Sequence, residues 1–494
     1  MFFYLLTAMA RSSTARNLLP LVMEGRAQTA ASAALEFLEG DEPGVRTGAA
    51  AMEQATLAAD LMLAQDRAEE AEDLYRIALK AATAAPRGQV RVISCRNTGF
   101  ISLYQRRYGT ALTSFQRMAE DDAATMAQQI EALAGMALTH HAVGRRDLAG
   151  QALDDACERI EACERKDGVA ETAMLSLLIR MVRIELAVQY AVRTNAALGD
   201  HIFWQSDAAY ASGRCPEAET LADIQACLVA AGGRTLLVQR LHYLASLVRA
   251  CLGDARAVAS SHEHLSWLRG MHLSAPERQC RLESALMAIV TRNADLARSL
   301  LEPLCTKNAE GPQRWNFEVS YCRAKLCEMT GQNEECLRHY QRYALESLTC
   351  LRMETHRQPA GKPSQGRAGS SGDEVELALP AKYRRAYRYL LAHMERADLS
   401  VHEIAEHIGV TERALQSAFR SHLGMTPVEV LRRNRVERIH DDLLNGQTCG
   451  QTVIETAARW GISNRSTLVS SYRKHFRETP ADTLARRDPV TLSA

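Results

Sequence analysis

Apolar residues recur at helical spacing along almost the whole chain up to about Leu351. These segments are rich in Ala, Leu, Glu and Arg, which are strong helix formers, and none alternates apolar and polar residues as a half-buried strand does. The pattern therefore predicts that the chain is all-α.

A three-residue pattern repeats within this region: a small residue, an apolar or aromatic residue four positions later, and another apolar residue three positions after that. A small residue where two helices cross, followed by larger residues on the same face, is what an antiparallel helix pair needs to close and stack on its neighbour. Adjacent copies lie 38 to 40 residues apart, and the copies are Ala71-Tyr75-Ala78, Ala111-Phe115-Met118, Ala149-Leu153-Ala156, Ala297-Leu301-Leu304 and Cys336-Tyr340-Tyr343. A turn signal precedes each copy: Gln65-Asp66-Arg67, Arg106-Arg107-Tyr108, Gly144-Arg145-Arg146, Arg292-Asn293 and Gly331-Gln332-Asn333.

These copies resemble tetratricopeptide repeats, which are stacked helix hairpins. The period of that family is ~34 residues, and of its glycine signature only Gly99 and Gly135 remain here. Between about Ala156 and Ala297 the pattern degrades, so insertions or irregular helices are expected there. A non-repetitive helical domain is the alternative, because Ala/Leu periodicity is common.

Composition changes sharply after the helical region. Residues 357–372 read RQPAGKPSQGRAGSSG, which is too polar and too rich in Gly, Pro and Ser to bury a core, and this predicts a flexible linker. From Leu377 to the end there are 18 Lys and Arg against 13 Asp and Glu, whereas the preceding residues carry 41 against 46. The basic end is the part suited to a polyanion. We expect a helical-repeat regulatory domain at 1–351, a linker at 352–376 and a third part at 377–494.

The C-terminal part repeats internally with a period of 52 to 53 residues. Each copy starts with a capping box, in which a hydroxyl and a carboxylate satisfy free backbone donors at a helix start, and continues into a glycine turn and a second helix. The capping boxes are Ser400-Val401-His402-Glu403 and Thr452-Val453-Ile454-Glu455, and the turns are Gly409-Val410-Thr411 and Gly461-Ile462-Ser463. The buried stripes of the second helices are Leu415, Phe419 and Leu423, and Leu468, Tyr472 and Phe476; Thr426-Pro427 and Thr479-Pro480 close the copies. Small Ala405 and Ala457 hold equivalent places in the first helices.

Residues 427–445 join the copies and have the pattern of one continuous helix, ~28 Å long at 1.5 Å per residue. Such a helix would set the spacing of the two units. Two recognition helices held on one face can enter successive major grooves, whose centres lie ~34 Å apart.

From about Tyr387 to Arg487, this double helix-turn-helix pattern, with units at about 400–424 and 452–477, resembles the DNA-binding module of AraC/XylS transcription regulators. The resemblance implies that bases are read by Arg413, Gln416, Ser417, Arg465, Ser466 and Ser470, and that phosphates are bound by Arg420, Thr467, Arg473 and Lys474. Arginine bridges guanine O6 and N7, and glutamine bridges adenine N6 and N7, whereas phosphate contacts give affinity without sequence information.

Two alternatives remain for this module. The whole segment could be a helical protein-binding domain, and the three serines could be solvated helix surface instead of base contacts. The chain also departs from the family at two positions, where Arg477 replaces the usual glycine and Thr483 the usual tyrosine.

No sequence pattern supports an enzyme, a cofactor or a metal. His402 and Glu403 with His407 are similar to a zinc-protease motif, but the second histidine comes one residue too late for the ligand face. No phosphate loop, dinucleotide fingerprint or nucleophile elbow occurs. The apolar stretch Met1–Ala10 lacks a basic lead and is shorter than the ~20 residues that span a membrane, and the thirteen cysteines are scattered. We expect a cytoplasmic protein with reduced thiols and no membrane contact.

A helical array fused to this module resembles the Hrp-type regulators that activate type III secretion genes. The resemblance implies an activator that binds double-stranded promoter DNA and RNA polymerase. Two classes of function remain for the array. It either docks a protein on a concave face, such as a secretion chaperone, another regulatory protein or a second copy of itself, or it holds a small ligand between helices. An extended concave surface favours the protein.

Overall fold

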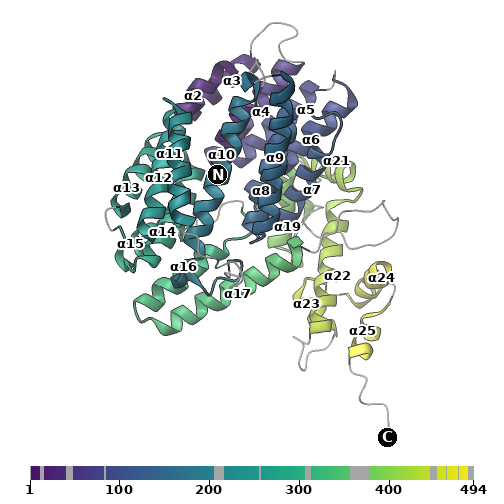
Figure 1. The fold of residues 1–494 in the computed structure, drawn as a ribbon. Helices are drawn as coiled ribbons and strands as arrows, with labels where there is room; N and C mark the ends of the chain where they lie inside the picture. The colour runs from purple at the N-terminus through teal and green to yellow at the C-terminus, as the bar shows by residue number, and fades with distance from the viewer. Residues whose placement is uncertain are drawn as a thin grey trace. The chain divides into compact units, whose positions relative to one another are not determined.

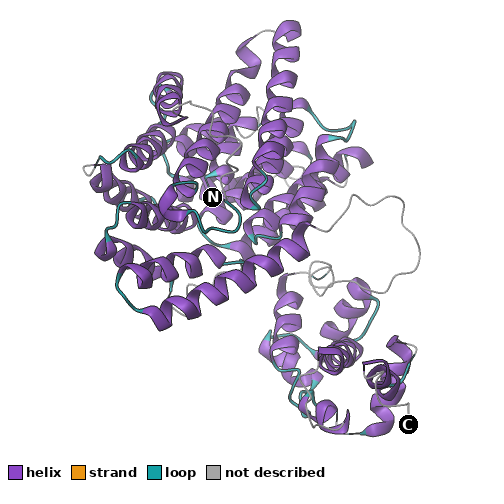
Figure 2. Ribbon diagram, turned by 60° about the horizontal axis from the view of Figure 1, so that its bottom comes forward, coloured by secondary structure: helices purple, strands orange, loops and turns teal. Residues whose placement is uncertain are grey.

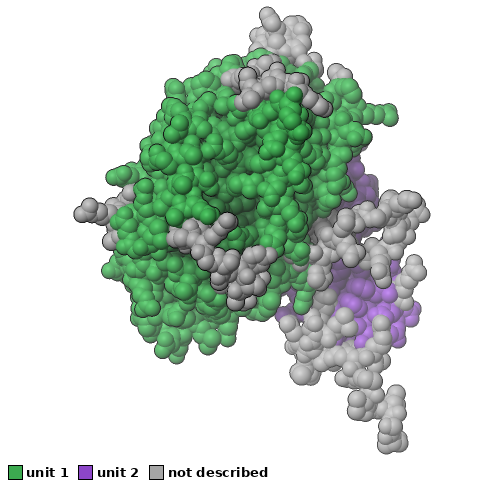
Figure 3. Space-filling view, in the orientation of Figure 1, with its two compact units in different colours: residues 1–361 green, residues 362–494 purple. Residues whose placement is uncertain are grey.

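A computed structural model describes residues 2–11, 16–39, 48–82, 85–167, 169–204, 216–254, 257–305, 313–355, 379, 381–445, 453–462, 464–476 and 478–487. Throughout these residues the regular structure is helical and no strand occurs (Figure 2), so the all-α prediction is confirmed. The chain divides into two compact units, residues 1–361 and 362–494 (Figure 3).

The first unit consists of helices that follow one another as antiparallel neighbours (Figure 1). Their bounds are α1 Phe3–Leu6, α2 Leu19–Met23, α3 Ala27–Glu39, α4 Ala49–Ala64, α5 Ala68–Ala81, α6 Arg87–Tyr104, α7 Tyr108–Ala119, α8 Met126–Ala142, α9 Arg146–Asp167, α10 Val169–Arg193, α11 Pro216–Ala231, α12 Thr235–Cys251, α13 Ala257–Gly270, α14 Ser274–Val290, α15 Ala294–Leu301, α16 Phe317–Met329 and α17 Asn333–Thr355. Helix α17 thus runs four residues into the segment predicted as linker, and residues 356–378 lie outside the described residues.

The repeated triples lie on the second helices of hairpins, α5, α7, α9 and α17, and the fourth begins on α15 and ends at Leu304 in the short 3-10 turn after it. In the first three copies all three side chains are buried, whereas Leu304, Cys336 and Tyr340 in the last two copies are half-buried. Gly99 of α6 and Gly135 of α8 both face the Phe115 ring, and a Cβ atom at either position would lie within 2.7 Å of it. These two glycines therefore let three helices close on one aromatic ring.

The turns inside these hairpins share one backbone feature. Each predicted turn signal contains a residue with positive φ: Asp66 at 67°, Arg106 at 58°, Gly144 at 75°, Arg292 at 56° and Gly331 at 72°. Positive φ ends a helix within one residue, so the second helix can start at once and fold back. Three of the five residues are not glycine, and each accepts a sterically unfavourable conformation.

The region where the triple fades contains one long helix, where insertions or irregular helices were expected. Helix α10 is 25 residues long and contacts α8, α9, α11, α12 and α14. Because α10 packs against five other helices, its apolar residues lie on several faces and do not follow the small-apolar-apolar spacing of the hairpins.

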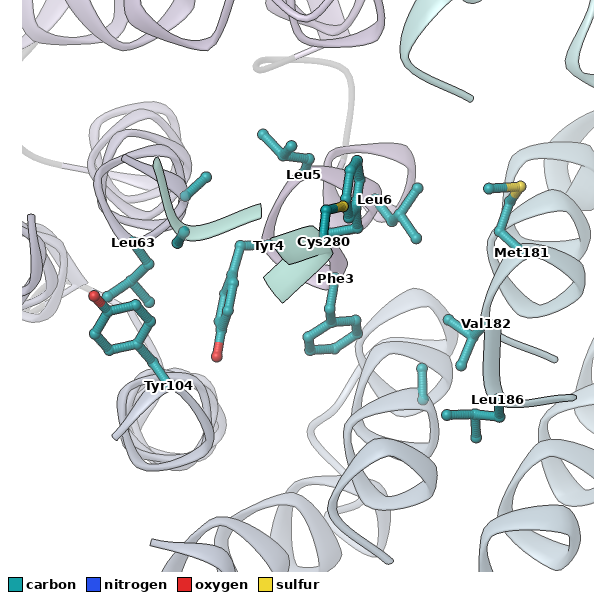
Figure 4. Close-up of a cluster of buried hydrophobic side chains, with 14 of the residues drawn as sticks. Phe3, Tyr4, Leu5, Leu6, Leu63, Tyr104, Met181, Val182, Leu186 and Cys280 are labelled. Carbon is teal, nitrogen blue, oxygen red and sulfur yellow. The ribbon is translucent and has the colours of Figure 1, made fainter. Parts of the chain in front are cut away.

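The apolar N-terminal segment is part of the core of this unit. Every residue from Phe2 to Met9 is buried, and the segment contacts α4, α8 and α10. Figure 4 shows Phe3 and Tyr4 between Tyr104 of α6 and Leu186 of α10. The Tyr4 hydroxyl donates to the Phe100 carbonyl at 3.3 Å. The array therefore folds around its own N-terminus.

The end of the array returns to the α6–α7 hairpin. The backbone N–H of Arg314 donates to the Gln105 carbonyl at 2.9 Å, and the N–H of Gly109 donates to the Glu354 carboxylate at 2.7 Å. The same carboxylate accepts from the Trp315 indole at 3.2 Å. Contacts between residues so distant in sequence close the array on itself.

The second unit has seven helices within the described residues: α19 Ala381–Ala392, α20 Val401–His407, α21 Glu412–Leu423, α22 Pro427–Asn445, α23 Val453–Arg459, α24 Arg465–Phe476 and α25 Pro480–Arg487. They share one apolar core, which includes Leu390, Leu415, Phe419, Ile439 and Tyr472. Helix α22 runs between the two helix pairs, as predicted.

Candidate nucleic-acid interface

The first helix-turn-helix unit consists of α20 and α21. The Ser400 hydroxyl caps α20 by accepting from the Glu403 N–H at 3.1 Å. Ala405 is buried, as its predicted place at a helix crossing requires. Gly409 follows with φ of 62° and ends the helix, so the predicted glycine turn is confirmed.

The carboxylate half of the predicted capping box at Ser400 has other partners. Glu403 accepts from the Tyr389 hydroxyl at 2.7 Å and from the Arg396 guanidinium at 2.6 Å. These bonds, the one from Tyr389 foremost, lower the pKa of the Glu403 carboxyl. The side chain thereby ties α20 to α19 and to the loop between them.

Helix α21 is amphipathic. The Thr411 hydroxyl caps it by accepting from the Ala414 N–H at 3.2 Å. Leu415 and Phe419 are fully buried, and Leu423 is half-buried, as the predicted stripe requires. The opposite face carries the four predicted DNA contacts, of which Arg413, Ser417 and Arg420 are exposed and Gln416 is half-buried. All four side chains lie on the face that a DNA groove can reach.

Helices α23 and α24 form the second helix-turn-helix unit in the same way. Gly461 has φ of 72°, and Leu468 and Tyr472 are buried with Phe476 half-buried. Arg465, Ser466, Ser470, Arg473 and Lys474 are exposed, and Thr467 is half-buried. Thr452 of the second capping box, Ser463 of the turn, Arg477 and the loop at 446–452 lie outside the described residues.

The caps show how the two recognition helices correspond. Asn464 caps α24 by accepting from the Ser466 N–H at 2.9 Å, in the place that Thr411 holds before α21. Arg413 is the second residue after its cap, and Arg465 is the first. The structural counterpart of Arg413 is therefore Ser466. The two recognition helices present different side chains at equivalent positions, so we expect them to read different bases.

Helix α22 and one of its arginines join the two units. The Arg435 guanidinium is buried, and it donates to the Met394 carbonyl at 2.7 Å, to the Gly461 carbonyl at 3.2 Å and to the Arg396 carbonyl. Two of these acceptors lie between α19 and α20, and the third lies in the turn of the second unit. Burial lowers the pKa of Arg435. Sequence reasoning missed this residue, because nothing local distinguishes it from the other arginines of α22.

Gly461 is needed at this junction for two reasons. Its positive φ is unfavourable for other residues, and a Cβ atom there would lie 2.8 Å from the Arg435 guanidinium and 3.1 Å from the Glu395 carbonyl. The close approach lets the guanidinium bond to the Gly461 carbonyl as well as to the loop between α19 and α20.

The end of the second helix-turn-helix unit, where α24 is followed by α25, has its own polar network. The Tyr472 hydroxyl lies 2.7 Å from His440 Nδ1 and 2.8 Å from the Thr483 hydroxyl, and Thr483 is completely buried. Thr483 donates to Glu478 at 2.8 Å. The residue that departs from the AraC/XylS pattern is thus part of a bonded cluster in this chain.

The histidines of the first helix-turn-helix unit interact with ordinary neighbouring side chains. His402 lies 3.0 Å from the Glu412 carboxylate, and the His407 ring stacks on Tyr389 at 4.1 Å. In the part of the chain that the structure describes, no three His, Cys, Asp or Glu side chains gather as a metal site. Nor does any described helix have the length and apolar character needed to cross a membrane.

Comparisons with known proteins agree with this geometry. A helix-turn-helix domain family matches residues 404–486. Regulatory protein HrpB of Ralstonia nicotianae is 39% identical over 447 residues, which cover 87% of this chain and 88% of that protein. Probable thc operon regulatory protein of Rhodococcus erythropolis is 34% identical over 22% of this chain and 33% of its own length. XylDLEGF operon transcriptional activator 2 of Pseudomonas putida is 27% identical over 21% of this chain and 65% of its own. No solved structure matches the chain.

Two capped recognition helices on a matched helix-turn-helix scaffold define a DNA-binding transcription regulator of the AraC/XylS type. Within that class, the likeness to HrpB extends over both units of the chain. The chain belongs to the HrpB family of regulatory proteins.

We predict that Arg435→Gln destabilises the folded unit of α19 to α25 by about 2 to 4 kcal/mol, because carbonyls of the α19–α20 loop and of the turn between α23 and α24 lose a charged donor. Arg432→Gln is the matched control, since Arg432 is exposed on the same helix, and it should change stability by less than about 0.5 kcal/mol. Chemical denaturation followed by circular dichroism measures both. Equal midpoints for the two variants would refute the bridging role of Arg435.

Proposed function

We propose that this protein is a cytoplasmic activator that binds promoters of type III secretion genes through both recognition helices. The observation that carries the proposal is the exposed polar face of α21 and α24, which lies opposite a buried stripe on each helix. The likeness to HrpB over the whole chain supports the assignment to this kind of regulator.

Each exposed side chain has a role in this proposal. Arg413 and Arg465 bridge guanine, and Gln416 bridges adenine. Ser417, Ser466 and Ser470 contact bases where the helix lies deepest in the groove. The phosphate contacts are made by Arg420, Thr467, Arg473 and Lys474, and their affinity falls as salt rises because bound counterions are released. RNA polymerase is the proposed second partner at the promoter.

For the first unit we propose a protein partner, such as a secretion chaperone or another regulatory protein. What supports a polypeptide ligand is that the inner face of the array already binds one, its own segment Phe2–Met9. A partner that presents an apolar helix could compete with this segment or dock beside it.

A second candidate is a small organic anion, and a cavity of about 330 Å³ in the first unit favours it. The cavity is lined by Phe3, Trp204, His141, Arg193 and Arg323, among others. Burial lowers the pKa of His141 to about 3, so this ring is neutral at pH 7. Glu185, Glu283 and Glu318 also line the cavity, and Glu318 pairs with Arg193 at 2.5 Å, so Arg323 is the proposed partner for a carboxylate with an apolar body.

The base contacts make one prediction. Arg413→Ala and Arg465→Ala should each weaken binding to the cognate site by about 1 to 3 kcal/mol and relax preference at one base position. Lys474→Ala should weaken all sequences alike. Selection of bound sequences from a random pool measures both effects. Unchanged base preference in both arginine variants would show that these side chains do not read bases.

The two candidates for the array make different predictions. Under the first, residues 1–350 capture a defined protein from cells grown under inducing conditions, and metabolites leave the thermal midpoint unchanged. The assignment would pass to a small ligand under three conditions together: one organic anion raises the thermal midpoint, Arg323→Ala abolishes that rise, and no protein is captured.

A further inference from the structure

Each recognition helix ends in basic residues and is followed closely by a carboxylate. Glu429 comes nine residues after Arg420, and Asp482 comes nine residues after Arg473. The two arginines lie in the last turns of α21 and α24, and the two carboxylates lie in the first turns of α22 and α25. The same pairing of a basic and an acidic residue therefore occurs once in each helix-turn-helix unit.

Capping bonds hold both carboxylates in place. Glu429 accepts from the Thr426 backbone N–H at 2.8 Å and from the Thr426 hydroxyl at 2.9 Å. Asp482 accepts from the Thr479 N–H at 2.8 Å and from the Thr479 hydroxyl at 2.7 Å. Both acidic side chains are nevertheless exposed to solvent. A capping box needs an acceptor at this position, and a neutral Gln also serves there. The cap alone therefore does not account for the two negative charges.

Glu429 lies within electrostatic reach of both recognition helices. Its bonds from Thr426 foremost, and then the positive charges of Lys474 and Arg420, lower the pKa of the Glu429 carboxyl. Arg420 belongs to α21 and Lys474 to α24, and both are exposed residues for which we propose phosphate contacts. The Glu429 carboxylate thus faces the basic ends of both helices.

The second unit repeats the arrangement. The bonds from Thr479, and then the positive charge of Arg473, lower the pKa of the Asp482 carboxyl. Among the described residues, neither Asp482 nor Glu429 forms an ion pair with a Lys or Arg side chain. The basic side chains are therefore close enough to be affected by the carboxylates and are still available to a phosphate.

A phosphate that binds Arg420 or Lys474 must approach the Glu429 carboxylate as well. Like charges repel each other within the Debye length, which is ~8 to 10 Å at ordinary ionic strength. We infer that Glu429 and Asp482 limit the affinity of this protein for DNA of any sequence, by repelling the phosphates that the neighbouring basic side chains bind. The inference rests on the proposed phosphate contacts. Because non-promoter sites greatly outnumber promoters, weaker sequence-independent binding leaves more of the protein free to reach its own sites.

Fluorescence anisotropy of the full chain tests the inference, with a regulated promoter and a scrambled duplex at about 50 to 300 mM salt. Glu429→Gln and Asp482→Asn each keep a cap acceptor and remove one negative charge. Each variant should tighten binding to both duplexes by about threefold at low salt, and the double variant by about tenfold. Affinity should also fall more steeply with salt, because each phosphate contact then neutralises more charge. Circular dichroism checks that the helix content is kept.

Glu395→Gln is the matched control. Glu395 is exposed and lies in the loop between α19 and α20, so its removal changes the net charge equally. It should change the affinity by less than about 1.5-fold. An equal gain in this variant would overturn the inference, because net charge alone would then explain the effect. Unchanged or weaker binding in Glu429→Gln and Asp482→Asn would overturn it too.

The wild type tests the proposed function separately in the same experiment. Equal affinity for the promoter and the scrambled duplex would contradict promoter recognition. The effect of the two carboxylates would still be measured, because it is the ratio of variant to wild-type affinity on either duplex.

Discussion

The Arg435 guanidinium bonds together two segments that are far apart in the sequence, the loop between α19 and α20 and the turn between α23 and α24. A helix-turn-helix unit reads only a few base pairs, so two units recognise a promoter together only if their separation matches the groove repeat. Helix α22 lies between the two helix-turn-helix units, and Arg435 of this helix bonds to carbonyls of the loop that leads into the first and of the turn inside the second. A pair of units fixed before binding loses less entropy on DNA than two flexibly linked units would.

The first unit, residues 1–361, is organised by a different constraint, the burial of the segment Phe2–Met9. Its neighbours include a buried charged cluster in which Asp60 accepts from Arg96 at 2.8 Å and from Tyr75 at 2.6 Å, and also pairs with Arg11. Buried charges need several partners at once. The pairing of Arg11 with Asp60 therefore specifies where the chain lies directly after the buried segment Phe2–Met9. The inner face of the array is therefore occupied, and a partner must either displace the segment or use another surface.

Periodicity in the sequence was sufficient to predict the hairpins, the positions of turns such as those at Gly144 and Gly331, and the buried stripes of α21 and α24. These features depend on residues within one or two turns of each other. The sequence did not predict the insertion of Phe2–Met9, because a short apolar run has no period that shows where it packs. Nor did it predict the bonds of Arg435 or the partners of Glu403, which join residues that only the tertiary fold brings together. The sequence likewise did not show that Arg413 corresponds to Ser466 and not to Arg465, because this depends on where the two helices are capped.

Hydroxyl-radical footprinting of the full chain on a regulated promoter tests whether one chain reads DNA through two rigidly spaced helices. A fixed spacing predicts, for each bound copy, two protected patches centred about 10.5 base pairs apart on the same face of the duplex. A single protected patch per copy, or two patches whose spacing varies between promoters, would contradict it.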